Sequence, residues 1–351
     1  MKVKGKFIYE QLDKLYQQAR SVQIGEKDRL VIFSDLHMGD GSSTDDFKVN
    51  ADLFAYALEH YYHQKEYKLV LNGDVEELQR YSLKKIHKAW SNVIELFSKF
   101  GDNLYKTVGN HDLKLSVLSR EELQHPVDDA IKLCFEEGEI FIFHGHQASK
   151  KYQRHNQLVG FTLKYFANPL GIKNYSVSHD SRKQFKIEKI AYHYAAYKKV
   201  ISVIGHTHRP LFESLHKMDR IRFKIEQLCR DFANTREPHI AKAIKVLRQS
   251  LKKAHKEQML EKQDGGYMYN SLLLLPCLFN SGTVIGKRGM TCLEIENGKI
   301  SLVHWFDKKI SKKYLRTNEN QPQQVGDTDY YRMVINTDDL NYIFARVKLL
   351  S

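Results

Sequence analysis

The segment Val200-Ile201-Ser202-Val203-Ile204-Gly205-His206-Thr207-His208 places two imidazoles directly after an apolar run. Such a run predicts a short strand that is buried on both faces. Gly205, which has no side chain, lets the backbone approach a neighbouring segment closely. Ligand sites of open α/β sheets lie beyond the carboxyl ends of the strands. We therefore expect a functional site at His206 and His208.

The same arrangement recurs at four earlier points of the chain. Apolar runs at 30–33, 68–71, 104–108 and 139–143 each end in residue types that bind metals. These residues are Asp35, His37, Asp74, Asn110, His111 and His144. Helical patterns separate the runs, and strands that alternate with helices predict a layered α/β fold.

The residues at the strand ends form a mixed nitrogen and oxygen donor set. Carboxylates, amide oxygens and imidazoles all bind first-row metals. Alternate residues of an extended segment, such as Asp35 and His37, project to one side and can reach one ion. The whole set exceeds the needs of one ion and suits two divalent ions about 3.5–4 Å apart, bridged by a carboxylate. Singly, each residue has a structural alternative, such as a helix cap at Asp74; together they favour a metal site.

The order of these motifs resembles that of the calcineurin-like metallophosphoesterase superfamily. The motifs are Asp35-x-His37, Gly73-Asp74, Gly109-Asn110-His111-Asp112, His144 and Gly205-His206-x-His208. The resemblance implies a four-layer α/β/β/α sandwich over residues 28–306. It also implies a first metal held by Asp35, His37 and His208, and a second held by Asn110, His144 and His206, with Asp74 as the bridge.

The resemblance further implies a dimetal-dependent hydrolase of phosphomonoesters, phosphodiesters or pyrophosphates, acting by in-line attack of metal-bound hydroxide. Manganese is the favoured metal, and iron, zinc and cobalt also accept such donors. His111, which follows Asn110, would stabilise the transition state or protonate the leaving oxygen. Many members carry an acidic residue three positions after the bridging Asp to orient this His. Here that residue is Glu77, and Asp112 is a competing orienter.

The remaining segments frame this core. Residues 1–27 predict a lead-in helix, and two basic helical insertions are expected at about 150–199 and 214–266. Strands near 272–306 would form the second sheet. The C-terminal extension, 307–351, ends in an apolar stretch at 342–350 that is expected to dock on the core.

The charge of the chain favours an anionic partner. The 351 residues carry a net charge of +13, which indicates a phosphorylated substrate, nucleic acid or an anionic membrane surface. Residues 217–262 hold 13 Lys and Arg against 6 Asp and Glu, a net +7. Their two apolar stripes predict an αα-hairpin that could serve as a lid, a dimer or membrane contact, or a nucleic-acid surface. Lys150, Arg154 and Arg209 are candidates for substrate phosphate contacts. The oligomeric state is left open.

The hydropathy of the chain and its cysteines indicate the cellular compartment and the redox state of the thiols. The chain shows neither a membrane-length apolar run nor a signal-like N-terminus, so a cytoplasmic protein is expected. Its 4 cysteines are far apart, which indicates reduced thiols rather than disulfides or a thiolate zinc site.

Two motifs narrow the resemblance. Residues 34–39 and 205–210 are similar to the bacterial UDP-2,3-diacylglucosamine hydrolase group, which cleaves a pyrophosphate in a lipid precursor. That group has Arg at the position of His111 and Asp at the position of His146. The alternatives are therefore such a pyrophosphate hydrolase, or a basic nucleic-acid phosphodiesterase or binder. A scaffold with a vestigial site is disfavoured, because every ligand position is filled.

Overall fold

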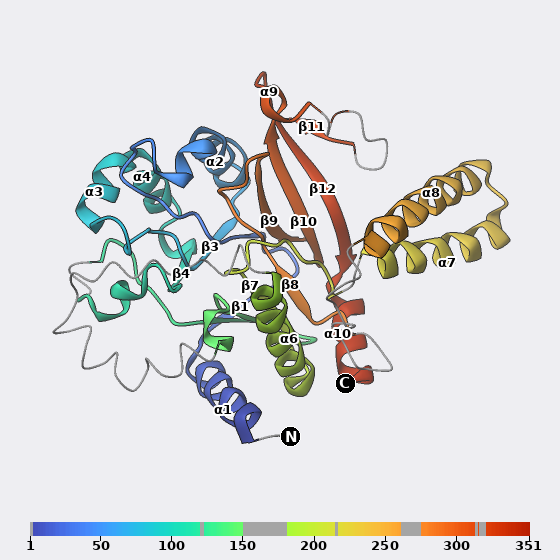
Figure 1. Cartoon of the computed structure of the whole chain (residues 1–351), viewed down its shortest axis with the longest axis horizontal. Coiled ribbons are helices and arrows are strands. Elements are labelled where there is room, and N and C mark those ends of the chain that lie inside the picture. Colours follow the sequence, from blue (N-terminus) through green and yellow to red (C-terminus); the bar gives the residue numbers. More distant parts are fainter. Residues whose placement is uncertain are drawn as a thin grey trace.

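Two β-sheets pack face to face between layers of helices in the computed structural model of the chain (Figure 1). The structure describes residues 3–119, 123–149, 181–214, 217–260, 275–312, 315 and 321–351. Two sheets enclosed by helices confirm the predicted four-layer α/β sandwich.

The larger sheet has seven strands. In spatial order they are β11 (Gln323–Gln324), β12 (Tyr330–Asp339), β10 (Lys299–Asp307), β9 (Met290–Glu296), β2 (Leu30–Phe33), β3 (Lys68–Asn72) and β4 (Leu104–Thr107). The predicted strands β2, β3 and β4 are parallel, and β9 adds to β2 in the antiparallel sense, with Leu30 opposite Ile295. The loops after β2, β3 and β4 therefore leave the sheet at one edge.

The smaller sheet has five strands. Their spatial order is β1 (Arg20–Gln23), β5 (Ile131–Cys134), β6 (Glu139–Ile142), β7 (Ile201–Ile204) and β8 (Leu278–Asn280). Strands β6, β7 and β8 are parallel neighbours. The loops that carry His144 and His206 therefore also leave their sheet at a common edge.

Alternation along the fully buried strand β2 builds two cores. Leu30 and Ile32 pack into the core between the two sheets, whereas Val31 and Phe33 pack into the core beneath the outer helices. Successive side chains of a strand point to opposite faces, so one apolar run serves both layers. Burial of each large apolar side chain contributes about 1.5–3 kcal/mol.

Helices cover both outer faces. On the side of the larger sheet lie α2 (Ala51–Ala57), the π-helix η2 (Leu58–His63), α3 (Leu83–Ala89) and α4 (Ser91–Lys99). The smaller sheet packs against α1 (Val3–Gln18) and α6 (Ser181–Lys198), and α10 (Leu340–Leu350) buries its apolar face in the same core. The described residues also form five short helices: η1 (Asp46–Val49), η3 (Gly101–Asn103), η4 (Leu113–Val117), η5 (His146–Ala148) and α9 (Lys308–Ser311).

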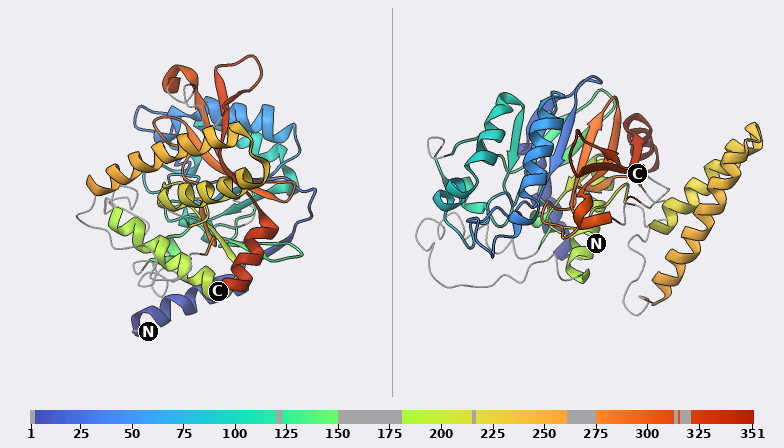
Figure 2. Two further views of the ribbon diagram at one scale, coloured as in Figure 1. Left: turned by 90° about the vertical axis from the view of Figure 1, so that its right-hand side faces the viewer. Right: turned by 90° about the horizontal axis from the view of Figure 1, so that it is seen from above.

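The predicted αα-hairpin is present. Helices α7 (Lys217–Thr235) and α8 (Pro238–Leu260) pack on each other. They project from the two sheets as a separate arm (Figure 2).

Several predicted boundaries are corrected. The N-terminal helix ends at Gln18 and an edge strand, β1, follows; its sequence, Arg-Ser-Val-Gln, is too polar to show a strand pattern. The strands near 272–306 do not form the second sheet together, because β8 completes the smaller sheet while β9 and β10 extend the larger one. Most of the predicted strand 272–275 lies outside the described residues. The C-terminal extension contributes β12 to the larger sheet, and α10 docks on the core as expected.

Candidate metal centre

The loops that leave the two sheets bring the predicted ligands together under backbone strain. Five of these ligands adopt positive φ angles: Asp35 at 55°, His37 at 49°, Asp74 at 52°, His206 at 64° and His208 at 55°. Non-glycine residues rarely occupy this region, and each costs of order 1–3 kcal/mol. Such strain persists where the surrounding structure enforces it, and here it turns these side chains toward one centre.

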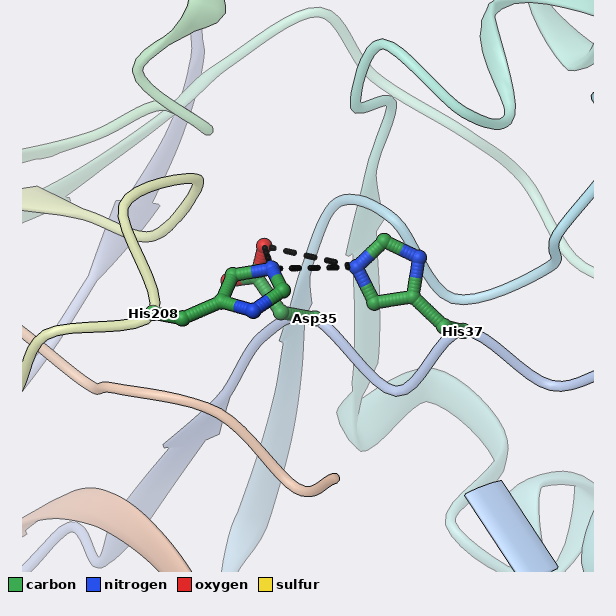
Figure 3. A group of neighbouring side chains, drawn as sticks. All are labelled: Asp35, His37 and His208. Atoms are coloured by element: carbon green, nitrogen blue, oxygen red, sulfur yellow. Dashed lines mark hydrogen bonds and ion pairs between the residues drawn. The ribbon is translucent and has the colours of Figure 1, made fainter. Parts of the chain in front are cut away.

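A first group joins Asp35, His37 and His208 (Figure 3). Nε2 of His208 lies 3.1 Å from Oδ1 of Asp35 and 3.1 Å from Nε2 of His37. The Asp35 carboxylate is fully buried and also accepts the backbone N–H of His206. Two imidazole nitrogens and one carboxylate oxygen thus converge on one point, a donor set that suits a first-row divalent ion.

A second group joins Asp74, His144 and His206. Nε2 of His144 lies 3.0 Å from Oδ2 of Asp74. The Nδ1–H of His144 donates to the carbonyl oxygen of Asn72 at 2.8 Å, which leaves the lone pair of Nε2 facing the centre. Asn110 Oδ1 is buried without a hydrogen-bond partner among the described residues. An orphaned buried acceptor of this kind fits a site that holds a cation.

The protonation preferences of this group also fit a cation. Burial and the charge of His144 lower the pKa of His206 to about 3, so this imidazole stays neutral, the form that coordinates metals. Burial opposes a charge on His144, but the carboxylates of Asp74 and Asp35 raise its pKa to about 10. The two buried carboxylates therefore favour positive charge at the position that Nε2 faces.

Close approach of the loops depends on glycine. A Cβ atom on Gly205 would lie 2.6 Å from Oδ2 of Asp35, and one on Gly73 would lie 2.5 Å from Nδ1 of His144. Both distances are shorter than real Cβ contacts, so a side chain at either position would displace a candidate ligand.

Of the two carboxylates predicted to orient His111, Glu77 contacts its ring and Asp112 binds backbone N–H groups instead. Oε2 of Glu77 accepts from Nδ1 of His111 at 2.7 Å and from Nδ1 of His37 at 3.0 Å. Asp112 instead accepts the backbone N–H groups of Val75 and Gly109, at 2.7 Å and 2.5 Å. Glu77 is therefore placed to orient both rings, whereas Asp112 holds together the loops after β3 and β4.

His111 forms a third group of converging ligand atoms with His37 and Asp74, and its Nδ1 contacts the Glu77 carboxylate. Its backbone N–H donates to Oδ1 of Asp74 at 2.7 Å, and its ring stands perpendicular to that of His37 with centroids 4.6 Å apart. Burial disfavours a charge on His111, but Asp74 and Glu77 raise its pKa to about 9. A protonated imidazole beside the centre can donate to a phosphoryl or leaving oxygen.

Of the three predicted substrate contacts, the structure describes only Arg209. Lys150 and Arg154 lie outside the described residues. Arg209 turns its guanidinium to Glu188 of α6, with Nε 3.1 Å from Oε1 and Nη2 bonded to Oε2.

Glu188 is the site residue that the sequence did not reveal. It is fully buried and also accepts the hydroxyl of Thr207 at 2.9 Å. No local pattern marks this residue, because it lies in a helix expected to belong to an insertion. His146 is buried as well, with its ring centroid 5.5 Å from that of His144.

Comparison with known proteins decides the family. The sequence model of the calcineurin-like phosphoesterase family matches residues 28–228, more than half of the chain. The chain belongs to the calcineurin-like phosphoesterase family. The match spans the loops of both His and Asp groups. Membership and these groups together support a metal-dependent phosphoester hydrolase.

Two solved structures show a distant similarity to this phosphoesterase. A single mutant of Vps29 from Entamoeba histolytica is 10% identical, with a TM-score of 0.31, and the match covers 79% of this chain and 92% of that chain. A conserved uncharacterized protein from Streptococcus pneumoniae, described as a predicted phosphoesterase, is 9% identical with a TM-score of 0.29; the match covers 81% and 91%. These TM-scores are too low to carry an argument.

No curated protein matches the sequence. In the described part of the chain, no helix is both long and apolar enough to cross a bilayer.

Proposed function

We propose that this phosphoesterase hydrolyses phosphate esters with two divalent ions, which Asp74 would bridge. The main support for this proposal is the position of the Asp74 carboxylate, which lies near a histidine of each group. Its Oδ2 lies 3.0 Å from Nε2 of His144 and 3.9 Å from Nε2 of His37. Asp35, His37 and His208 would hold the first ion, and Asn110, His144 and His206 the second.

Divalent ions at such a centre neutralise the phosphoryl group and lower the pKa of a coordinated water. The groups contain nitrogen and oxygen donors and no thiolate. Such a donor set can bind Mn²⁺, Fe²⁺, Zn²⁺ or Co²⁺. Manganese is our first expectation.

The chain's own residues supply the remaining chemistry. Glu77 accepts from both Nδ1 atoms of His37 and His111, which leaves both Nε2 atoms directed away from it. His37 thereby presents a lone pair to the first group. His111 can donate a proton from Nε2 to a phosphoryl or leaving oxygen.

Metal reconstitution tests the proposal. The chelated protein would be loaded with each of the four metals and assayed on chromogenic monoesters and diesters, UDP-sugar pyrophosphates and nucleic acids, with metal content measured by mass spectrometry. We expect two ions per chain and metal-dependent turnover. The panel also distinguishes a general esterase from a UDP-2,3-diacylglucosamine-type pyrophosphatase.

The variant Asp74→Asn should lose one ion and nearly all turnover. Its control, Asp102→Asn, neutralises an exposed carboxylate in η3. A wild-type protein that binds one ion, or an Asp74→Asn variant that keeps two ions and full turnover, would contradict the two-ion assignment.

A further inference from the structure

The projecting arm carries a one-sided cationic helix. Residues 238–256 of α8 contain six Lys and Arg and no Asp or Glu. Among those whose side chains the structure describes, Lys242, Lys245, Arg248 and Lys252 are all exposed. None of these four forms an ion pair with another described residue. The steps of three and four residues place them along one face of the helix, which we call the cationic face.

The cationic face points away from the partner helix. The apolar stripe of α8, with Ile240 buried and Leu247 and Leu251 partly buried, packs on α7. At about 100° per residue, the stripe is centred near Ile240, and the four basic residues lie about 80–200° around the helix from it, Arg248 on the flank and the three lysines on the far side. α7 therefore covers the apolar side of α8 and leaves the basic side open to solvent, on an arm that stands clear of the sheets (Figure 2).

We propose that the cationic face of α8 binds the phosphate backbone of a nucleic acid. From Lys242 to Lys252 the helix rises about 15 Å. A duplex presents one phosphate charge per about 1.7 Å of its axis, so about nine phosphates lie within reach of these four cations. Lys and Arg contacts of this kind are sequence-independent.

The arrangement favours nucleic acid over a membrane surface. A helix that lies in a membrane interface inserts a broad apolar face beside its basic flanks. Here the apolar stripe is occupied by α7, and Val246, at 40% exposure, is the large apolar residue that α8 exposes among its described side chains. The exposed side of α8 therefore offers positive charge but no broad apolar face that could insert into a membrane.

Binding can be measured apart from catalysis. Fluorescence anisotropy would follow the full-length protein with labelled duplex and single-stranded DNA and RNA of scrambled sequence, in a chelator so that no strand is cleaved. For duplex DNA we expect log K to fall with log [salt] at a slope of about −3 to −4, since four phosphate contacts contribute about −0.9 each, and for single strands at about −3, since each contributes about −0.7. The result does not depend on the proposed hydrolase activity, which a small chromogenic ester reports separately.

The decisive variant replaces Lys242, Lys245, Arg248 and Lys252 with Gln. Affinity at low salt should fall at least tenfold, and the salt slope should flatten toward zero. The matched control replaces the exposed Lys27, Lys84, Lys299 and Lys348 with Gln; it removes equal charge and should bind almost as the wild type does.

Circular dichroism would verify that both variants are folded. Wild-type protein that binds no nucleic acid at low salt, or a cationic-face variant that binds as tightly as its control, overturns the proposal. Binding to phosphatidylserine vesicles without binding to nucleic acid overturns it in favour of a membrane surface.

Discussion

Glu188 offers a test of how the fold holds the loop of His206 and His208. The substitution Glu188→Gln keeps the shape of a side chain that is fully buried in α6. It removes the charge that now accepts Nε and Nη2 of Arg209 and the hydroxyl of Thr207. The amide of Gln would also face the Arg209 donors with a donor of its own.

The expected cost follows from these bonds. Breaking a buried ion pair costs about 3–5 kcal/mol, but the side chain of Arg209 is 42% exposed and water can replace part of the loss. We therefore expect the free energy of unfolding to fall by about 2 kcal/mol. Groups behind a metal ligand typically change metal affinity by about 10–100-fold. Because Glu188 acts through residues that flank the ligands, we expect the lower end, about tenfold weaker binding.

The chain contains a matched control in Glu294. This buried carboxylate of β9 also holds one arginine, Arg332, by Nε and Nη2, and accepts one hydroxyl, from Tyr62. Arg332 is only 11% exposed, so Glu294→Gln should cost about 3 kcal/mol, but its partners lie on β12 and η2 and not on the ligand loops. Urea unfolding of the chelated proteins gives the stabilities, and calorimetric Mn²⁺ titration gives the affinities. Unchanged affinity in Glu188→Gln, or an equal loss in both variants, would refute the reasoning.

Three further predictions concern the metal centre. His111→Asn should keep both ions yet lower kcat by about 10²–10⁴-fold; loss of metal content would instead make His111 a ligand. Gly205→Ala should abolish metal loading because its Cβ would lie 2.6 Å from Oδ2 of Asp35, whereas Gly101→Ala, at a φ of 52° with no atom within 4 Å, should cost only about 1–2 kcal/mol of backbone strain and load normally. Chelation should lower the melting temperature, because ions at 100 times their Kd stabilise the native state by about 2.7 kcal/mol each; a melting curve that chelator leaves unchanged would contradict tight binding by the folded protein.

The strands that carry the candidate ligands were predicted well, because each is specified by a short local stretch of sequence. Short apolar runs specify buried strands, and β2, β3, β4, β6 and β7 formed within a residue or two of those runs. Each motif follows its strand directly, so parallel pairing alone brings the motifs to one edge. The αα-hairpin was equally readable, because its two apolar stripes pack on each other.

The sequence did not predict which sheet each C-terminal strand joins, because pairing depends on which strands of the two sheets have an unpaired edge. β9 and β10 carry apolar runs that would suit either sheet, yet β9 completes the open edge of β2 while β8 completes that of β7. The half-buried β12 shows too mixed a pattern to be read as a strand.

By itself, the sequence determined which residue types stand at the strand ends, and thereby the donor set of the candidate metal centre and the phosphoesterase family. Only the tertiary structure decided how those residues are supported. Glu77 rather than Asp112 contacts His111, and Glu188 holds Arg209 and Thr207. The physical reason is distance along the chain: a donor and acceptor 34 or 21 residues apart leave no periodic trace, and only packing brings them within hydrogen-bond reach.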